Sequence, residues 1–119
     1  MPEKTKRFFF CIVFLLTIRH VTPCPSGCRC DVFTWNSSRG KFVNGTNCSN
    51  ASLTSIPVGL DSTITILIVS YNNISIVRNN EFYQMKLSEL NRIDLSNNGL
   101  TIIEGNALRG LRKLHELRL

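Results

Sequence analysis

The sequence is short of the residues and motifs that enzymes use. It has 119 residues but only two histidines, and His20 lies in an N-terminal segment that we expect to be removed. His115 would then be alone, whereas nucleophilic catalysis needs a base and an orienting group held together. The sequence has no glycine-rich phosphate loop and no HExxH or GxSxG motif. We therefore predict no enzymatic activity, no cofactor and no metal site.

A hydrophobic run long enough to cross a membrane is also missing. The longest apolar run, Phe8 to Ile18, has 11 residues, whereas a membrane-spanning helix needs about 20. The run follows Lys4, Lys6 and Arg7, and this order is typical of a secretory signal peptide. We predict a signal peptide in residues 1–22, with an uncleaved anchor or a buried apolar helix as the alternative.

Basic residues are not gathered in the sequence, although the net charge is +6. Without residues 1–22, ten basic and seven acidic residues remain, a net charge of +3. The longest basic run of that remainder is Arg112-Lys113. A nucleic-acid-binding surface needs a clustered basic face, so we do not expect a nucleic-acid partner.

Cysteine is confined to the first half of the chain. Of the five cysteines, Cys11 lies in the predicted signal peptide and the other four lie within residues 24–48. An even number in an exported chain favours disulfides, and four cysteines can pair in three ways. A zinc site is the alternative, but the spacing between Cys28 and Cys30 is tight for that geometry.

An apolar pattern repeats through the second half of the sequence. Residues 90–100 (LNRIDLSNNGL) fit LxxLxLxxNxL, residues 64–74 fill the same positions 26 residues earlier, and a third copy starts at Leu114. The pattern resembles the leucine-rich repeat, whose coils stack into a solenoid. Asn72 and Asn98 take its asparagine position, where we expect buried amides to satisfy backbone groups as the chain leaves each strand.

The cysteine segment carries a second resemblance. CPSGCRC at residues 24–30, then Cys48 and LTSIP at residues 53–57, resemble the cysteine-rich N-terminal cap of extracellular leucine-rich repeat proteins. The resemblance implies disulfides Cys24–Cys30 and Cys28–Cys48, a cap in residues 23–61 and repeats in residues 62–119. Turn residues 36–40 between two apolar stretches predict a β-hairpin within the cap.

These features predict an α/β-type solenoid: a short leucine-rich repeat arc with parallel strands on its concave face and a disulfide-linked β-hairpin cap. The third copy stops at Leu119, before its asparagine and closing apolar residue. We expect the chain to be incomplete at its C-terminus and to be the front of a longer protein. A self-sufficient chain that forms a homodimer through the open end is the alternative.

Side chains between the fixed apolar positions should face outward from the concave strands, because side chains alternate along a strand. Equivalent positions form the rows Ile66–Arg92–Glu116 and Ile68–Asp94–Arg118, and the ends of the strands add two more residues. The candidate ligand-binding residues are Ile66, Ile68, Tyr71, Arg92, Asp94, Asn97, Glu116 and Arg118. Two alternatives are that Arg92–Glu116 and Asp94–Arg118 only pair with each other, and that the cap hairpin covers the two isoleucines.

The chain also has several acceptor motifs for N-linked glycans. We predict glycosylation among Asn36, Asn44, Asn50 and Asn73, whereas Asn47 directly precedes a disulfide cysteine and is the weakest site. Together, these features favour a secreted or cell-surface protein that binds an extracellular protein ligand. The resemblance implies a range from receptors to matrix proteins, so a structural matrix role is the alternative. Membrane attachment would need a segment downstream of Leu119.

Overall fold

The computed structural model describes residues 24–36 and 41–119, so the predicted signal peptide in residues 1–22 lies outside the described residues. The described chain forms short strands joined by long connecting segments, with a single turn of helix between two of them. In chain order the elements are β1 (Arg29–Asn36), β2 (Lys41–Asn47), β3 (Ile66–Ile68), β4 (Ile76–Val77), α2 (Glu81–Gln84), β5 (Arg92–Asp94), β6 (Ile102–Ile103) and β7 (Glu116–Arg118).

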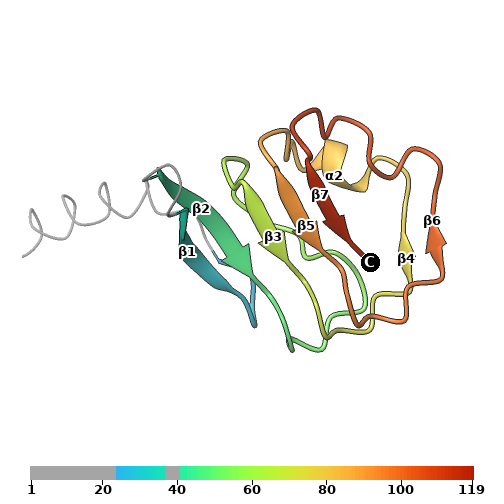
Figure 1. The fold of residues 1–119 in the computed structure, drawn as a ribbon. Coiled ribbons are helices and arrows are strands. Elements are labelled where there is room, and N and C mark those ends of the chain that lie inside the picture. Colours follow the sequence, from blue (N-terminus) through green and yellow to red (C-terminus); the bar gives the residue numbers. More distant parts are fainter. Residues whose placement is uncertain (1–23, 37–40) are drawn as a thin grey trace, which may run out of the picture.

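The strands form two sheets on opposite sides of a solenoid (Figure 1). One sheet has the order β1-β2-β3-β5-β7, and β4 pairs with β6 in the other. β1 and β2 are antiparallel, whereas β2, β3, β5 and β7 run parallel to one another. Each complete coil therefore contributes one strand to the large sheet and one to the small sheet. This architecture confirms the predicted solenoid with parallel strands on its concave face.

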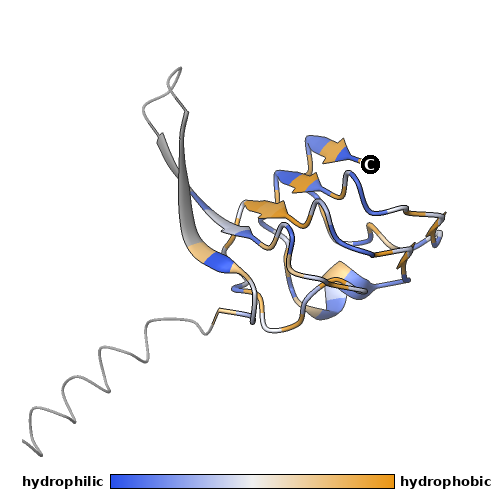
Figure 2. Cartoon of the chain, turned by 90° about the horizontal axis from the view of Figure 1, so that it is seen from below, coloured by the Kyte–Doolittle hydropathy of each residue, from blue (hydrophilic) through white to orange (hydrophobic). Residues whose placement is uncertain are grey.

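The core lies between the two sheets. The central residues of β3 and β5, Leu67 and Ile93, are fully buried because alternate side chains of a strand point to the same face. Phe82 of α2 reaches the same core from the connecting segment and is also fully buried. Figure 2 shows that β3 is hydrophobic along its length, whereas β5 and β7 have hydrophobic centres between polar ends. The polar residues at the ends of β5 and β7 do not form this core and are therefore available for binding.

Two asparagine amides connect neighbouring coils. The Asn98 amide nitrogen donates to the carbonyls of Val69 and Leu95, both at 2.9 Å, and its oxygen accepts from the Ile74 N–H at 3.0 Å. Asn72 donates to the same Val69 carbonyl at 2.9 Å and also to the Cys48 carbonyl. The two amides therefore form the predicted ladder. Asn98 is buried, but Asn72 is only half-buried, which corrects the prediction, because the short cap segment covers it less fully than a complete coil would.

The cap continues the concave sheet rather than sitting apart from it. β1 and β2 form the predicted hairpin, and β2 pairs in parallel with β3. The four cysteines form the disulfides Cys24–Cys30 and Cys28–Cys48, the two pairs that the resemblance implies. The zinc alternative therefore does not describe this cap. In residues 24–36 and 41–119, no helix is long and apolar enough to span a membrane.

The longer disulfide is expected to contribute more stability than the shorter one. Cys28 and Cys48 are 20 residues apart and Cys24 and Cys30 only six. Chain entropy then predicts a loss of about 3 kcal/mol in the free energy of unfolding for Cys28→Ala/Cys48→Ala and about 2 kcal/mol for Cys24→Ala/Cys30→Ala. Urea unfolding followed by circular dichroism measures both. A larger loss for the Cys24–Cys30 pair would contradict this prediction.

Candidate ligand-binding site on the concave sheet

The predicted rows of side chains are present on the concave sheet. Ile66 aligns with Arg92, which aligns with Glu116, and Ile68 aligns with Asp94, which aligns with Arg118. The cap extends both rows, since Gly45 aligns with Ile66 and Asn47 with Ile68. The candidate residues therefore come from consecutive strands of one surface.

The two isoleucines are less exposed than the sequence suggested. Both Ile66 and Ile68 are half-buried on β3, which pairs with β2 of the cap on one side and with β5 on the other. The two isoleucines are therefore less exposed than predicted. Gly45, the β2 partner of Ile66, has no side chain, so partial coverage by the cap hairpin stays a prediction. Their remaining exposed surface still lies beside the charged ends of β5.

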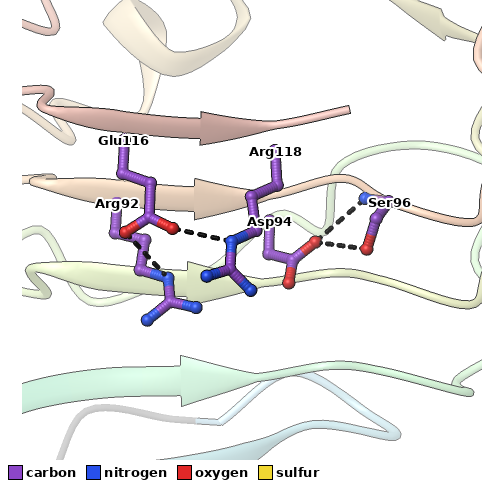
Figure 3. Close-up of polar contacts among 5 residues, drawn as sticks. All are labelled: Arg92, Asp94, Ser96, Glu116 and Arg118. Carbon is purple, nitrogen blue, oxygen red and sulfur yellow. Dashed lines mark hydrogen bonds and ion pairs between the residues drawn. The ribbon is translucent and has the colours of Figure 1, made fainter.

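The charged residues pair differently from the prediction (Figure 3). Glu116 accepts from Arg118 Nε at 2.6 Å, and its other oxygen lies 3.5 Å from Arg92 Nε. The predicted Arg92–Glu116 pair is confirmed as an ion pair only, since the buried Arg92 Nε has no hydrogen-bond partner among the described residues. The predicted Asp94–Arg118 pair is wrong, because Arg118 binds Glu116. One carboxylate therefore holds two guanidinium groups.

Asp94 has a local structural contact instead. Its Oδ1 accepts from the Ser96 N–H at 3.0 Å and from the Ser96 hydroxyl at 2.6 Å (Figure 3). Asn47 makes the same two contacts with Ser49 at the equivalent place in the cap. Asp94 is 9% exposed, so it stabilises the turn after β5 and offers a ligand much less surface than we predicted.

Tyr71 and Asn97 follow β3 and β5 at equivalent positions, directly before the ladder asparagines. Their φ angles are 56° and 57°, and Asn50 of the cap has φ 54° at the matching position. The stacking is direct, since Asn50 N–H donates to Ser70 and Tyr71 N–H donates to Ser96. Asparagine tolerates this left-handed conformation, whereas a bulky side chain in it is unusual. Tyr71 is also 59% exposed, so a strained aromatic residue projects from the end of the concave sheet.

The predicted glycosylation sites lie in the cap and in the segment after β3. Asn50 and Asn73 are exposed, whereas Asn44 is half-buried and donates to the Thr63 hydroxyl at 3.3 Å. Asn36 is the last residue of β1. Asn47 is half-buried like Asn44, and its side-chain oxygen accepts from the Ser49 N–H. Glycosylation at Asn36, Asn44, Asn50 and Asn73 stays a prediction.

Comparison with known proteins agrees with the repeat pattern. The sequence model described as "Leucine rich repeat" matches residues 62–119. Human leucine-rich repeat-containing protein 3B is 32% identical over 100 residues, which cover 84% of this chain and 35% of that protein. The chain is a leucine-rich repeat protein.

Other leucine-rich repeat proteins match over similar parts of the chain. Bovine asporin is 39% identical over 71 residues, covering 60% of this chain and 19% of asporin. The leucine-rich repeat-containing G-protein coupled receptor 5 of Xenopus tropicalis is 29% identical over 124 residues, covering 98% of this chain and 13% of the receptor. The chain therefore spans about a third or less of the length of these relatives.

A solved structure shows the same fold. The crystal structure of human 5T4, also called trophoblast glycoprotein, matches with a TM-score of 0.65 and 24% identity over 80% of this chain and 31% of that chain. Leucine-rich repeat solenoids present extended concave surfaces that bind other molecules, typically proteins, and they are generally not enzymes. The concave sheet of this leucine-rich repeat protein is therefore its candidate binding surface.

Proposed function

We propose that this leucine-rich repeat protein binds an extracellular protein ligand through its concave sheet. Tyr71 is the anchor of the site, and Arg92, Glu116 and Arg118 form its charged part. Ile66, Ile68 and Asn97 complete the contact surface, whereas Asp94 stabilises the turn after β5. A secreted or cell-surface location follows from this proposal, because two disulfides persist in an oxidising compartment.

The conformation of Tyr71 is the observation that carries this proposal. Two of the three stacked equivalent positions hold asparagine, and Tyr71 is the one that places a large side chain in the left-handed region; Lys86, outside the concave sheet, is the other large side chain with positive φ. That conformation costs roughly 1–2 kcal/mol for a residue other than glycine. Tyr71 is 59% exposed, so burial recovers only part of this cost, and a contact with a ligand explains the conformation better than packing does. Tyrosine is also among the residues that contribute most to protein interfaces.

The charged part of the site suits a ligand that carries an exposed carboxylate. Glu116 binds both Arg92 and Arg118, and the side chain of Arg118 remains 55% exposed. A guanidinium that is already oriented loses less conformational freedom when it binds a carboxylate. The two arginines, Asp94 and Glu116 together carry no net charge. A partner with a small apolar patch beside one exposed carboxylate would fit this surface.

Replacing Tyr71 by asparagine should separate binding from stability. Because asparagine tolerates positive φ, the free energy of unfolding of Tyr71→Asn should rise by about 1 kcal/mol. Affinity for the ligand should fall at least roughly tenfold, because the aromatic anchor is lost. Urea unfolding and biolayer interferometry measure the two effects. A variant that is both less stable and equally tight in binding would contradict the assignment of Tyr71.

The ligand can be sought by screening the secreted chain against purified ectodomains and matrix proteins. A ligand of the concave sheet should be lost in Tyr71→Asn and in Arg118→Glu but retained in Arg78→Gln, which removes an exposed charge elsewhere. The screen should be repeated after glycosidase treatment, because a glycan on Asn50 would lie next to Tyr71. Binding that survives both concave variants would overturn the proposal. Incorporation of those variants into insoluble matrix would then favour the structural matrix role.

A further inference from the structure

We propose a second binding site, an outer basic pocket that takes a short acidic segment of a partner protein. The pocket lies at the edge of the solenoid, between the segment that follows α2 and the segment that leads into β7. It has a volume of about 530 Å³, and its walls include Phe82, Tyr83, Lys86, Leu87, Arg112 and Lys113. None of these residues belongs to the concave sheet, so this site is separate from the proposed concave site.

Positive charge is concentrated at this pocket. Residues 62–119 contain seven basic residues, and four of them, Lys86, Arg109, Arg112 and Lys113, lie in or beside it. All four are exposed. One carboxylate of the pocket lining, Glu89, binds Lys113 Nζ at 2.7 Å. Three cations therefore remain for an anionic ligand in this small region.

The coil period explains why the cations meet. Lys86 and Arg112 are 26 residues apart, which is the spacing between the first two repeats, so they occupy matching places on stacked coils. Neighbouring parallel strands lie about 4.8 Å apart, and successive coils keep a similar spacing. Two charges on adjacent coils can therefore reach neighbouring carboxylates of one extended peptide.

An aromatic residue and a glycine shape one wall of the pocket. A Cβ atom at Gly110, where φ is +84°, would lie 2.8 Å from Tyr83 Cδ2, so only glycine lets the ring approach this closely. The Arg109 guanidinium carbon lies 4.8 Å from the centre of the same ring. This contact orients Arg109 at the rim and covers one face of the Tyr83 ring.

The aromatic wall of the pocket favours a peptide over a sulfated polysaccharide. Phe82 and Leu87 line the pocket but are 0% and 1% exposed, so Tyr83, which is 53% exposed, offers the apolar surface. A polysaccharide could use the cations, but its sugar rings would have to stack on Tyr83, whose face Arg109 already occupies. A peptide can place an aliphatic side chain against the edge of the Tyr83 ring, which does not need a free ring face, while its carboxylates reach Lys86 and Arg112. The preferred ligand is therefore an acidic segment with one apolar residue among its carboxylates.

Fluorescence anisotropy with a synthetic glutamate-rich peptide that carries a central leucine tests this site on the whole secreted chain. Lys86→Gln/Arg112→Gln should weaken binding about tenfold, since exposed charge pairs each contribute modestly. Arg29→Gln/Arg78→Gln removes the same charge from exposed positions outside the pocket and should change affinity less than roughly twofold. Replacing the leucine of the peptide by serine should weaken binding by roughly fivefold because the apolar contact is lost.

Three results would overturn the proposal. They are an absence of peptide binding by the wild-type chain at low ionic strength, an equal loss in the two double variants, and no effect of the leucine in the peptide. Heparin oligosaccharides that bind more tightly than the peptide and depend on Lys86 and Arg112 would assign the pocket to a polysaccharide instead. The Tyr71→Asn variant should bind the peptide as tightly as the wild-type chain, because Tyr71 lies outside the pocket. Failure of the pocket proposal and failure of the concave-site proposal are therefore recognised separately.

Discussion

Replacing Asn98 by alanine is expected to lower the free energy of unfolding by about 4 kcal/mol, because two buried backbone groups lose their partner. The Ile74 N–H and the Leu95 carbonyl both bond to the Asn98 amide, at 3.0 and 2.9 Å. The Val69 carbonyl would keep its bond from Asn72. Asn98 is 5% exposed, so water does not easily take the place of the amide.

Asn97→Gly is the matched control for this substitution. Asn97 is adjacent but exposed, and glycine adopts its φ of 57° readily. The free energy of unfolding of this variant should stay within roughly 0.5 kcal/mol of the wild-type value. Urea denaturation with circular dichroism detection measures both variants. A loss below about 1 kcal/mol in Asn98→Ala would show that the ladder amide is not required for stability.

The positions of the ladder and of the buried strand centres could be predicted because they depend on spacing alone. Ile93 lies two residues before Leu95 and five before Asn98, and every coil must repeat that spacing to bury its apolar face. The same spacing determines the register, so the sequence alone predicts the row Ile66–Arg92–Glu116. Periodic backbone geometry leaves few alternatives at such positions.

The partner of each charged side chain could not be predicted in this way. Arg118 has carboxylates within reach on its own strand and on the neighbouring one, and alternation places both Glu116 and Asp94 near it. Asp94 instead accepts from Ser96, two residues away in the chain. A contact with a residue so close in sequence costs little conformational entropy, and Asp-x-Ser is a local signal that could have indicated it.

The pairing of the cap with β3 and the outer basic pocket depend on segments whose placement is not periodic. β2 of the cap pairs with β3 in a register that four cysteine positions do not specify, and Ile66 and Ile68 are half-buried on β3. Arg109, Arg112 and Lys113 lie within five residues of the sequence, whereas Lys86 is 26 residues before Arg112. The 26-residue spacing that aligns Lys86 with Arg112 is a signal in the sequence that could have placed these two cations together.

Replacing Phe82 by alanine is expected to cost about 4 kcal/mol of unfolding free energy, since it removes a large side chain from the core and leaves a cavity. Phe82 is fully buried and is the largest side chain with that property among the described residues. Leu108 takes its place in the following coil, so a branched aliphatic side chain is compatible with this position. Phe82→Leu should therefore cost only about 1.5 kcal/mol.

The comparison between the two substitutions tests the coil equivalence more strictly than either one alone. If Phe82 and Leu108 fill the same place in successive coils, the leucine variant should recover more than half of the stability that the alanine variant loses. Tyr83→Ala is the control, because Tyr83 is adjacent in α2 but 53% exposed, and its loss should be near 1 kcal/mol or less. Urea unfolding of the three variants measures the loss in the free energy of unfolding for each of them. If leucine were as destabilising as alanine, Phe82 would be held by a shape specific to its own coil, and the repeat would not explain its position.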